Sequence, residues 1–251
     1  MMKRLYTLFF VAILCVSAAF AQNEDVLRAE QLYENQQYDS ALVVYEDLLN
    51  QGYHNAVLYY NIGNVYYKKN DVARAILYYE KAFLLNPHDS DIQHNLDFAR
   101  AQQVDKIESL GRGFVKSWYA RLYRLFNPNV WIVLSIISFL LFLSGLALFF
   151  FSSKLVYRKS GFFIGIILFL VSLVSYISAQ SRYTELTAHE YAIVVEPTVS
   201  IKTEPLETSK DLTVIHGGLK VKIIQEKQDW LLIRLSDGNK GWIKKRFIEE
   251  I

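Results

Sequence analysis

Cysteine is almost absent from this sequence, because the only thiol among its 251 residues belongs to Cys15. A single thiol cannot close a disulfide within the chain or supply a cysteine-rich zinc site. The scarcity therefore excludes a small disulfide-stabilised fold. If the N-terminus is removed, the mature chain contains no cysteine at all, which suits an oxidising compartment.

An excess of charge of either sign is also missing, since 27 Lys and Arg are balanced by 25 Asp and Glu. A net charge of +2 gives no basis for expecting a nucleic-acid partner. Catalytic motifs are missing as well. The five histidines are scattered, and the sequence has no HExxH, no phosphate-binding P-loop and no nucleophile elbow. We therefore predict a protein that is not an enzyme, with no catalytic residues, no metal and no other cofactor.

The N-terminus has the order of charged and apolar residues that is typical of a secretory signal. Two cations are followed by an apolar run over 5–16 and by the small-x-small sequence AFA. This order predicts a signal peptide over 1–21, with cleavage before Gln22. Two alternatives stay open, namely lipidation of Cys15 and an uncleaved membrane anchor.

Residues 56–89 form a unit of 34 residues with the pattern of two short helices. Large apolar residues recur near helical spacing, and small residues lie between them at Gly63 and Ala75. Pro87 follows the second helix, where it cannot continue one. The pattern recurs more weakly over 22–55. Two helices in a period of 34 residues resemble the tetratricopeptide repeat.

This resemblance implies an α-helical solenoid over 22–108, in which 90–108 is a cap helix. Arrays of this family present a concave groove that binds peptides or partner proteins. By position, the protein-binding groove would contain Glu30, Tyr33, Tyr60, Asn64, Tyr67, Lys68, His94 and Phe98. For any single one of these residues, packing in the repeat core is the alternative. Two repeats and a cap are a short array, so we expect it to need support from the membrane, the tail or a partner.

Acidic and basic residues are unevenly spread along the chain. Residues 22–108 contain 14 Asp and Glu against 7 Lys and Arg, whereas 111–128 contains four basic residues and no acid. The second segment also carries aromatic residues, among them Trp118 and Tyr119. We therefore expect 111–128 to be a basic amphipathic segment on the surface of a lipid bilayer, with its cations on lipid phosphates.

Two long apolar runs follow, over 130–151 and 161–179, and neither contains Asp, Glu, Lys, Arg or His. As helices they would be about 33 Å and about 28 Å long, which is enough to cross the hydrocarbon core of a bilayer. The sequence therefore predicts two transmembrane helices joined by a loop over 152–160. The absence of ionisable residues within the runs argues against a transporter.

The expected orientation follows from the signal peptide, which would carry the repeats out of the cytoplasm. The three cations of 152–160 are then cytoplasmic, as the positive-inside tendency prefers. The four cations of 111–128, taken alone, favour the opposite orientation. We expect an inner-membrane protein with two spans, whose repeats and tail both lie on the periplasmic side.

The tail consists of short runs of β-forming residues separated by Gly, Pro, Asp and Ser. Its Asp237-Gly238 turn and its closing Gly-Trp-Ile sequence resemble a bacterial SH3-like domain. The resemblance implies a small all-β SH3-like barrel over 189–251, with a ligand patch at Trp230 and Trp242 and peptidoglycan as a ligand.

Two observations leave that ligand open. Residues 200–204 depart from the Asn-x-Arg-x-Gly run that is frequent in this family. The two tryptophans can alternatively seal the barrel.

The order of the parts, from signal peptide through repeats and membrane hairpin to SH3-like tail, resembles the BatE-type proteins of the Bacteroides aerotolerance operons. That resemblance implies a membrane-associated assembly that includes proteins with von Willebrand factor A-like domains, and a link to oxidative or envelope stress. We therefore expect a non-enzymatic inner-membrane scaffold whose periplasmic repeats bind partner proteins. The alternative is a cell-wall-binding anchor that uses the SH3-like tail.

Overall fold

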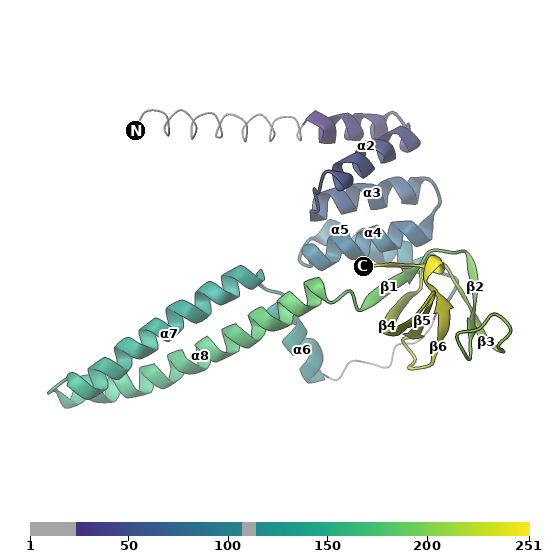
Figure 1. Ribbon diagram of the computed structural model, residues 1–251. Coiled ribbons are helices and arrows are strands. Elements are labelled where there is room, and N and C mark those ends of the chain that lie inside the picture. The colour runs from purple at the N-terminus through teal and green to yellow at the C-terminus, as the bar shows by residue number, and fades with distance from the viewer. Residues whose placement is uncertain (1–23, 107–113) are drawn as a thin grey trace, which may run out of the picture. The chain divides into compact units, whose positions relative to one another are not determined.

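The computed structural model describes residues 24–106 and 114–251, which divide into two compact units (Figure 1). The first unit joins the N-terminal residues to Glu190–Ile251, and the second lies within Leu110–His189. The predicted signal peptide over 1–21 is outside the described residues. The second unit is thus an insertion into the chain of the first.

The N-terminal part of the first unit is a stack of short antiparallel helices. They comprise a helix over 24–34, α2 (Tyr38–Asn50), α3 (Ala56–Lys68), α4 (Val72–Leu85) and α5 (Ser90–Ala101). This arrangement confirms the predicted tetratricopeptide-like helical module.

Side-chain caps determine where three of these helices begin. The Asn55 carboxamide accepts a hydrogen bond from the backbone N–H of Leu58 at 2.8 Å, at the start of α3. The carboxylates of Asp71 and Asp89 do the same at the starts of α4 and α5. Each cap satisfies an N–H group that has no partner within the helix.

Close packing of α3 on α4 depends on Gly63. A Cβ atom at this position would lie 2.6 Å from ring carbons of Tyr79, which is buried on α4. The ring cannot easily yield, because its hydroxyl donates to Asn64 at 2.7 Å. The small residues that mark the repeat in the sequence are therefore points of helix contact.

The cap helix α5 is shorter than the predicted 90–108, since it ends at Ala101. Beyond it the side chain of Gln103 donates to the carbonyl of Gly218, and Asp105 accepts from the backbone N–H of His216. These contacts hold the chain against the tail, which explains why the helix does not continue.

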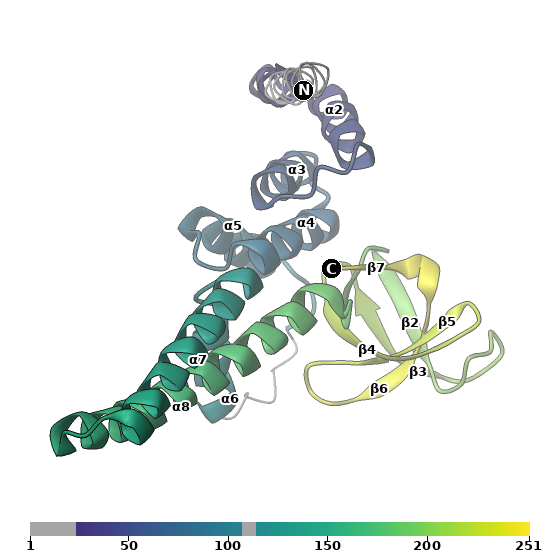
Figure 2. The same ribbon diagram turned by 60° about the vertical axis from the view of Figure 1, so that its left-hand side comes forward.

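The tail of the first unit is an antiparallel sheet with the strand order β3-β2-β6-β5-β4-β1-β7. The strands are β1 (Tyr191–Val194), β2 (Thr198–Lys202), β3 (Asp211–His216), β4 (Lys220–Lys227), β5 (Trp230–Arg234), β6 (Lys240–Lys244) and β7 (Ile248–Glu250). The sheet is strongly curled around an apolar core (Figure 2). It differs from the predicted barrel because, in this fully described tail, its edge strands β3 and β7 do not pair and the sheet stays open.

The repeats and the tail share one apolar cluster. Ile193 of β1 is fully buried together with Ile76 and Leu77 of α4 and Leu96 of α5. Gly218 lies so close to α4 that a Cβ atom there would be 2.9 Å from Ile76, and its φ of +91° also favours glycine. The tail thus supplies the apolar cover that a short array of repeats needs.

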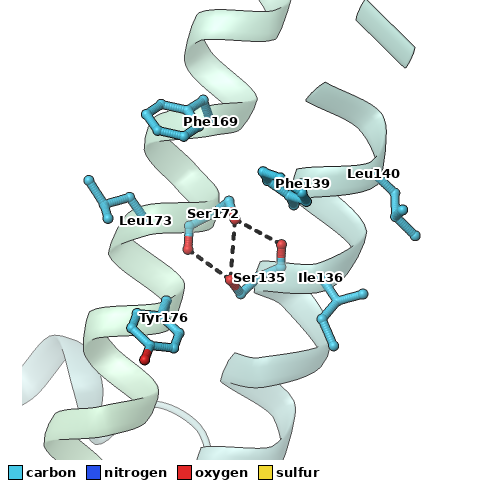
Figure 3. Close-up of a pocket in the computed structure, with 8 residues that line it drawn as sticks. All are labelled: Ser135, Ile136, Phe139, Leu140, Phe169, Ser172, Leu173 and Tyr176. Atoms are coloured by element: carbon cyan, nitrogen blue, oxygen red, sulfur yellow. Dashed lines mark hydrogen bonds between the residues drawn. The ribbon is translucent and has the colours of Figure 1, made fainter. Parts of the chain in front are cut away.

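The second unit consists of α6 (Phe114–Tyr123), α7 (Pro128–Phe151) and α8 (Leu155–Thr187). By length and composition, α7 and α8 could each cross a membrane. They pack side by side, and Ser135 and Ser172 donate to each other's backbone carbonyls at 3.0 and 2.9 Å (Figure 3). These bonds satisfy both hydroxyls within the helix pair, which suits an apolar surrounding.

The connection between these helices differs from the predicted loop over 152–160. Because 155–160 contains no Gly or Pro, α8 begins already at Leu155, and only Ser152–Lys154 separates the helices. The second helix also extends beyond 179, to Thr187. No helix-breaking residue occurs in that extension either, and its polar side chains find partners on α6.

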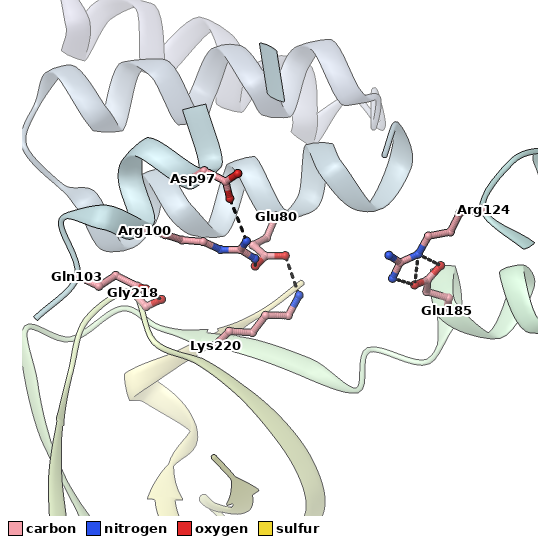
Figure 4. A network of polar contacts seen from close by, with 8 residues as sticks. All are labelled: Glu80, Asp97, Arg100, Gln103, Arg124, Glu185, Gly218 and Lys220. Carbon is pink, nitrogen blue, oxygen red and sulfur yellow. Dashed lines mark hydrogen bonds and ion pairs between the residues drawn. The ribbon is translucent and has the colours of Figure 1, made fainter. Parts of the chain in front are cut away.

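A further partner of α8 directly follows α6 in the sequence and corrects the interpretation of the basic segment. Arg124, which we expected on lipid phosphates, instead pairs with Glu185 of α8 (Figure 4). The hydroxyl of Tyr119 contacts that of Ser181 at 2.8 Å in the same helix pair. The sequence alone did not indicate this ion pair, because 61 positions separate the two residues.

We predict that Gly63→Ala destabilises the repeats by about 1–3 kcal/mol, because the added methyl group overlaps the Tyr79 ring. Helix propensity alone predicts the opposite sign, a gain of about 0.5–1 kcal/mol. Thermal unfolding of the full chain distinguishes the two. A variant that melts above the wild type would show that α3 and α4 are not in tight contact here.

Candidate functional site

The predicted groove residues of the second repeat and the cap lie on the facing sides of α3 and α5. Tyr60, Asn64, Tyr67 and Lys68 belong to α3, whereas His94 and Phe98 belong to α5. Direct contacts between the two sets bring them together: the rings of Tyr67 and Phe98 are 5.8 Å apart between centroids. The centre of this surface is an amide and hydroxyl network.

In that network the carboxamide of Asn64 has a defined orientation. Its Oδ1 atom accepts hydrogen bonds from the hydroxyl of Tyr79 at 2.7 Å and from Nδ2 of Asn95 at 3.0 Å. Burial raises the pKa of the Tyr79 phenol, so this hydroxyl remains a donor at neutral pH. With Oδ1 engaged twice, the Nδ2 group on the other side of the amide is oriented to donate to a bound acceptor.

Asn95 was not singled out by sequence reasoning, although it is central to the network. Its Nδ2 group also donates to the hydroxyl of Tyr60, at 2.9 Å. A signal was present in the sequence, because Asn95 follows Asn61 by one period of 34 residues.

At one end of the surface, stacked aromatic rings lie near a cation. Phe98 is 55% exposed, and the His94 ring stacks on it with a centroid distance of 6.4 Å. Next to it the hydroxyl of Tyr67 accepts a hydrogen bond from Gln102. Lys68 is exposed one residue further along α3. An apolar side chain and an acceptor can both be bound here.

The two groove residues predicted in the first repeat have contacts of a different kind. Tyr33 is half-buried against Tyr38, with a centroid distance of 5.6 Å, and packs on the core of its own repeat. Burial raises the pKa of its phenol. Glu30 accepts a long hydrogen bond of 3.5 Å from Asn61. Asn61 joins this repeat to α3, and Tyr33 both packs on the apolar cluster and interacts electrostatically with Tyr60 of the predicted groove.

Trp230 and Trp242 lie on the outer face of the tail sheet. Trp230 pairs with Lys244, and Trp242 pairs with Leu232, so all four side chains share one face. The core residues alternate with them on the opposite face. Trp230 is only 9% exposed, and the Lys244 ammonium lies 5.6 Å from its ring centroid. Trp242 is thus the more accessible member of the predicted patch.

A buried ion triad joins the repeats to the tail (Figure 4). The side chain of Glu80 on α4 is 2% exposed, and it accepts hydrogen bonds from Arg100 at 2.5 Å and from Lys220 at 2.7 Å. Burial alone would raise the pKa of Glu80. Attraction by the two cations outweighs that effect and lowers the pKa below the ordinary value of 4.5.

A second polar contact between repeats and tail involves Asp105. Its carboxylate accepts from the backbone N–H of His216 at 2.6 Å and contacts the ring Nδ1 of the same residue at 2.9 Å. Together with the bond from Gln103 to Gly218, it extends the interface along the end of the helical module.

The second unit contains a pocket of about 350 Å³ between α7 and α8, around Ser135 and Ser172 (Figure 3). Its walls are mostly apolar, with Phe139, Phe169 and Tyr176 among them. The two serine hydroxyls bond within the helix pair, so the pocket offers no evident site for polar chemistry. Within the described ranges, no three His, Cys, Asp or Glu side chains gather to hold a metal ion.

Comparison with protein families identifies the two soluble modules. A tetratricopeptide repeat is found at residues 56–89 and a bacterial SH3 domain at 197–249. The first is a class of helical repeat that binds proteins and is typically without catalytic chemistry. The second confirms the resemblance drawn from the tail sequence.

Comparison with individual proteins adds little. No curated protein matches the chain. Among solved structures, the chain is similar to "TPR2AB-domain:pHSP90-complex of yeast Sti1", with 19% identity and a TM-score of 0.29. That match covers 66% of this chain and 64% of the other, which is less than two thirds of its length. A similarity at this level does not bear on function.

The lowered pKa of Glu80 predicts how the attachment of tail to repeats depends on pH. At neutral pH the ion triad contributes fully, and the contribution disappears as pH falls below 4.5 toward the lowered pKa of the folded state. We expect Glu80→Gln to cost about 1–3 kcal/mol at neutral pH and less at about pH 3.5, below the ordinary pKa of the carboxyl. Chemical denaturation at both pH values measures the difference.

Asp97→Asn is the matched control, because Asp97 also pairs with Arg100 but is largely exposed. It should change stability little at either pH. A cost for Glu80→Gln that stays the same at both pH values would contradict the assigned role of the Glu80 carboxylate.

Proposed function

We propose that the protein is a non-enzymatic membrane adaptor whose concave surface between α3 and α5 binds an extended segment of a partner protein. The observation that carries the proposal is the orientation of Asn64. Its carboxamide oxygen is held by Tyr79 and Asn95, which leaves its N–H groups for a ligand. A preformed donor of this kind lowers the cost of ordering the site on binding.

The chemistry of the surface favours a ligand that is rich in acceptors. The hydroxyls of Tyr60 and Tyr67 each accept a bond within the protein, so their own protons remain to be donated. Lys68 adds a charged donor at the same end of α3. Backbone carbonyls of an extended peptide supply such acceptors, and the exposed Phe98 ring offers contact for an apolar side chain.

A membrane hairpin agrees with the contacts of the first unit. The repeats and the SH3 domain share a buried cluster and an ion triad, so both modules have to lie on one side of any membrane. The inserted second unit then crosses an even number of times. Two helices of sufficient length, α7 and α8, satisfy that condition. We propose that this side is the periplasm of an inner membrane, as the N-terminal signal pattern favours.

We further propose that the partners belong to an aerotolerance or envelope-stress complex and carry von Willebrand factor A-like domains. This step rests on the order of modules in the sequence, which resembles that of BatE-type proteins. The alternative is a cell-wall anchor, favoured by the bacterial SH3 domain at 197–249. Its ligand would meet Trp242 on the outer face of the sheet.

The groove assignment predicts which substitutions weaken peptide binding. Peptides selected from a random library on the purified full chain should bind Asn64→Ala about fivefold or more weakly, because one hydrogen bond is lost. Lys68→Glu should also weaken the binding of acceptor-rich peptides. Fluorescence anisotropy with a labelled selected peptide measures both effects.

Lys69→Glu is the matched control, since Lys69 pairs with Asp39 and not with the groove. It should bind the peptides like the wild type. Equal affinity for Asn64→Ala, Lys68→Glu and the wild type would show that the ligand lies elsewhere. Co-sedimentation of the full chain with purified peptidoglycan, lost in Trp242→Ala, would instead favour the cell-wall anchor.

The proposed topology predicts a labelling pattern for single cysteines in a Cys15→Ser background. Ser40, Ser153 and Thr208 are exposed sites in the repeats, the helix connection and the SH3 domain. In intact cells, Ser40→Cys and Thr208→Cys should react with a membrane-impermeant maleimide, and Ser153→Cys should react only after lysis. Opposite behaviour of Ser40→Cys and Thr208→Cys would rule out the hairpin, and complete inversion would reverse its orientation.

A further inference from the structure

The helix α5 takes part in two interfaces at once. Toward α3 it presents Asn95, which donates to Tyr60 and Asn64 in the proposed groove. Its C-terminal end carries Arg100, which donates to the buried Glu80 beside Lys220 of the SH3 domain. The 12-residue helix thus contacts the binding surface directly and reaches Lys220 of the SH3 domain through Glu80 of α4.

The contacts continue beyond the helix end. Gln103 and Asp105, just beyond α5, bond to Gly218 in the turn between β3 and β4 and to His216 at the end of β3. Leu96 of α5 lies in the same buried cluster as Ile193 of β1. Together with α4, α5 and the residues that follow it thus lie beside both the apolar and the polar contacts of the interface.

We propose that α5 couples the groove to the SH3 domain. Occupancy of the groove strengthens attachment of the domain to the repeats, and detachment of the domain weakens ligand binding in the groove. The two states are the attached domain seen here and a domain that has separated from α4 and α5. Linkage makes the effect reciprocal: whatever stabilises α5 at one surface stabilises it at the other. This coupling regulates the groove, so it rests on the peptide-binding function proposed above.

The coupling can be measured without any ligand, by hydrogen exchange in the full chain. The His216 amide reports attachment, because it donates to Asp105 across the interface. The Gly217 amide donates to Pro197 within the tail and controls for opening of the sheet itself. We expect Asn64→Ala to speed exchange at His216 by about threefold to tenfold and to leave Gly217 unchanged.

Asn61→Ala is the matched control for that experiment. Asn61 is the same residue type on the same helix, but it contacts Glu30 of the first repeat and not α5. It should leave the His216 amide unaffected. Unchanged exchange in Asn64→Ala, or an equal increase in both variants, overturns the coupling. If Asn64→Ala unfolds the repeats, Tyr60→Phe replaces it, since it removes only the hydroxyl that accepts from Asn95.

The reverse direction uses Lys220→Met, which weakens the interface from the side of the SH3 domain. It should speed exchange of the α5 amides and leave those of α2 unchanged. If the α5 amides exchange at the same rates in the wild type and in this variant, the proposal is also overturned. Peptide binding to the groove is not needed for either result, so loss of the coupling and loss of the proposed function are recognised separately.

Discussion

The rest of the structure depends on the burial of β1 against α4 and α5. Ile193 fills the apolar cluster that a further repeat would otherwise cover, and Glu80 is buried beside it with Arg100 and Lys220. Removing a carboxylate from water is unfavourable unless its partners replace the lost hydration. Here one cation comes from each module, so the triad is complete only when both are in place. Apolar cover and charge pairing thus select the same arrangement.

This contact also explains where the apolar helix pair α7 and α8 stands in the sequence. The second unit is inserted in the sequence between the repeats and the tail, which fold together, so the chain leaves the first unit and later returns to it. The packing within the hairpin is self-contained, since Ser135 and Ser172 satisfy each other.

The proposed binding surface and the attachment of the SH3 domain depend on the same helix. The helix α5 is too short to be stable alone, and it is held by the α3 network on one side and by the SH3 domain near its C-terminal end. The groove is consequently formed in part by a helix whose position depends on another domain. Regulation by that domain needs no additional element.

Local patterns in the sequence were enough to predict the elements and their classes. The 34-residue period predicts the repeats, because the small residues at helix contacts recur with it, as Gly63 against Tyr79 illustrates. Long uncharged runs predict α7 and α8, and alternation with turn residues predicts most strands of the tail. Of the candidate groove residues, Tyr67 of α3 and Phe98 of α5 are in contact, and Tyr33 packs on the apolar cluster that the first repeat shares with α3; the binding role of these residues stays a prediction.

The tertiary structure alone decided where these elements end and which charges pair. The cap helix stops at Ala101 because Gln103 and Asp105 bond to the tail more than a hundred residues later. Glu80 and Lys220 are separated by 140 positions, and Arg124 and Glu185 by 61. Helix period and strand alternation are local properties and can be read from neighbouring residues. The partner of a charge depends on which distant surfaces meet, and that is settled only when the apolar faces are buried together.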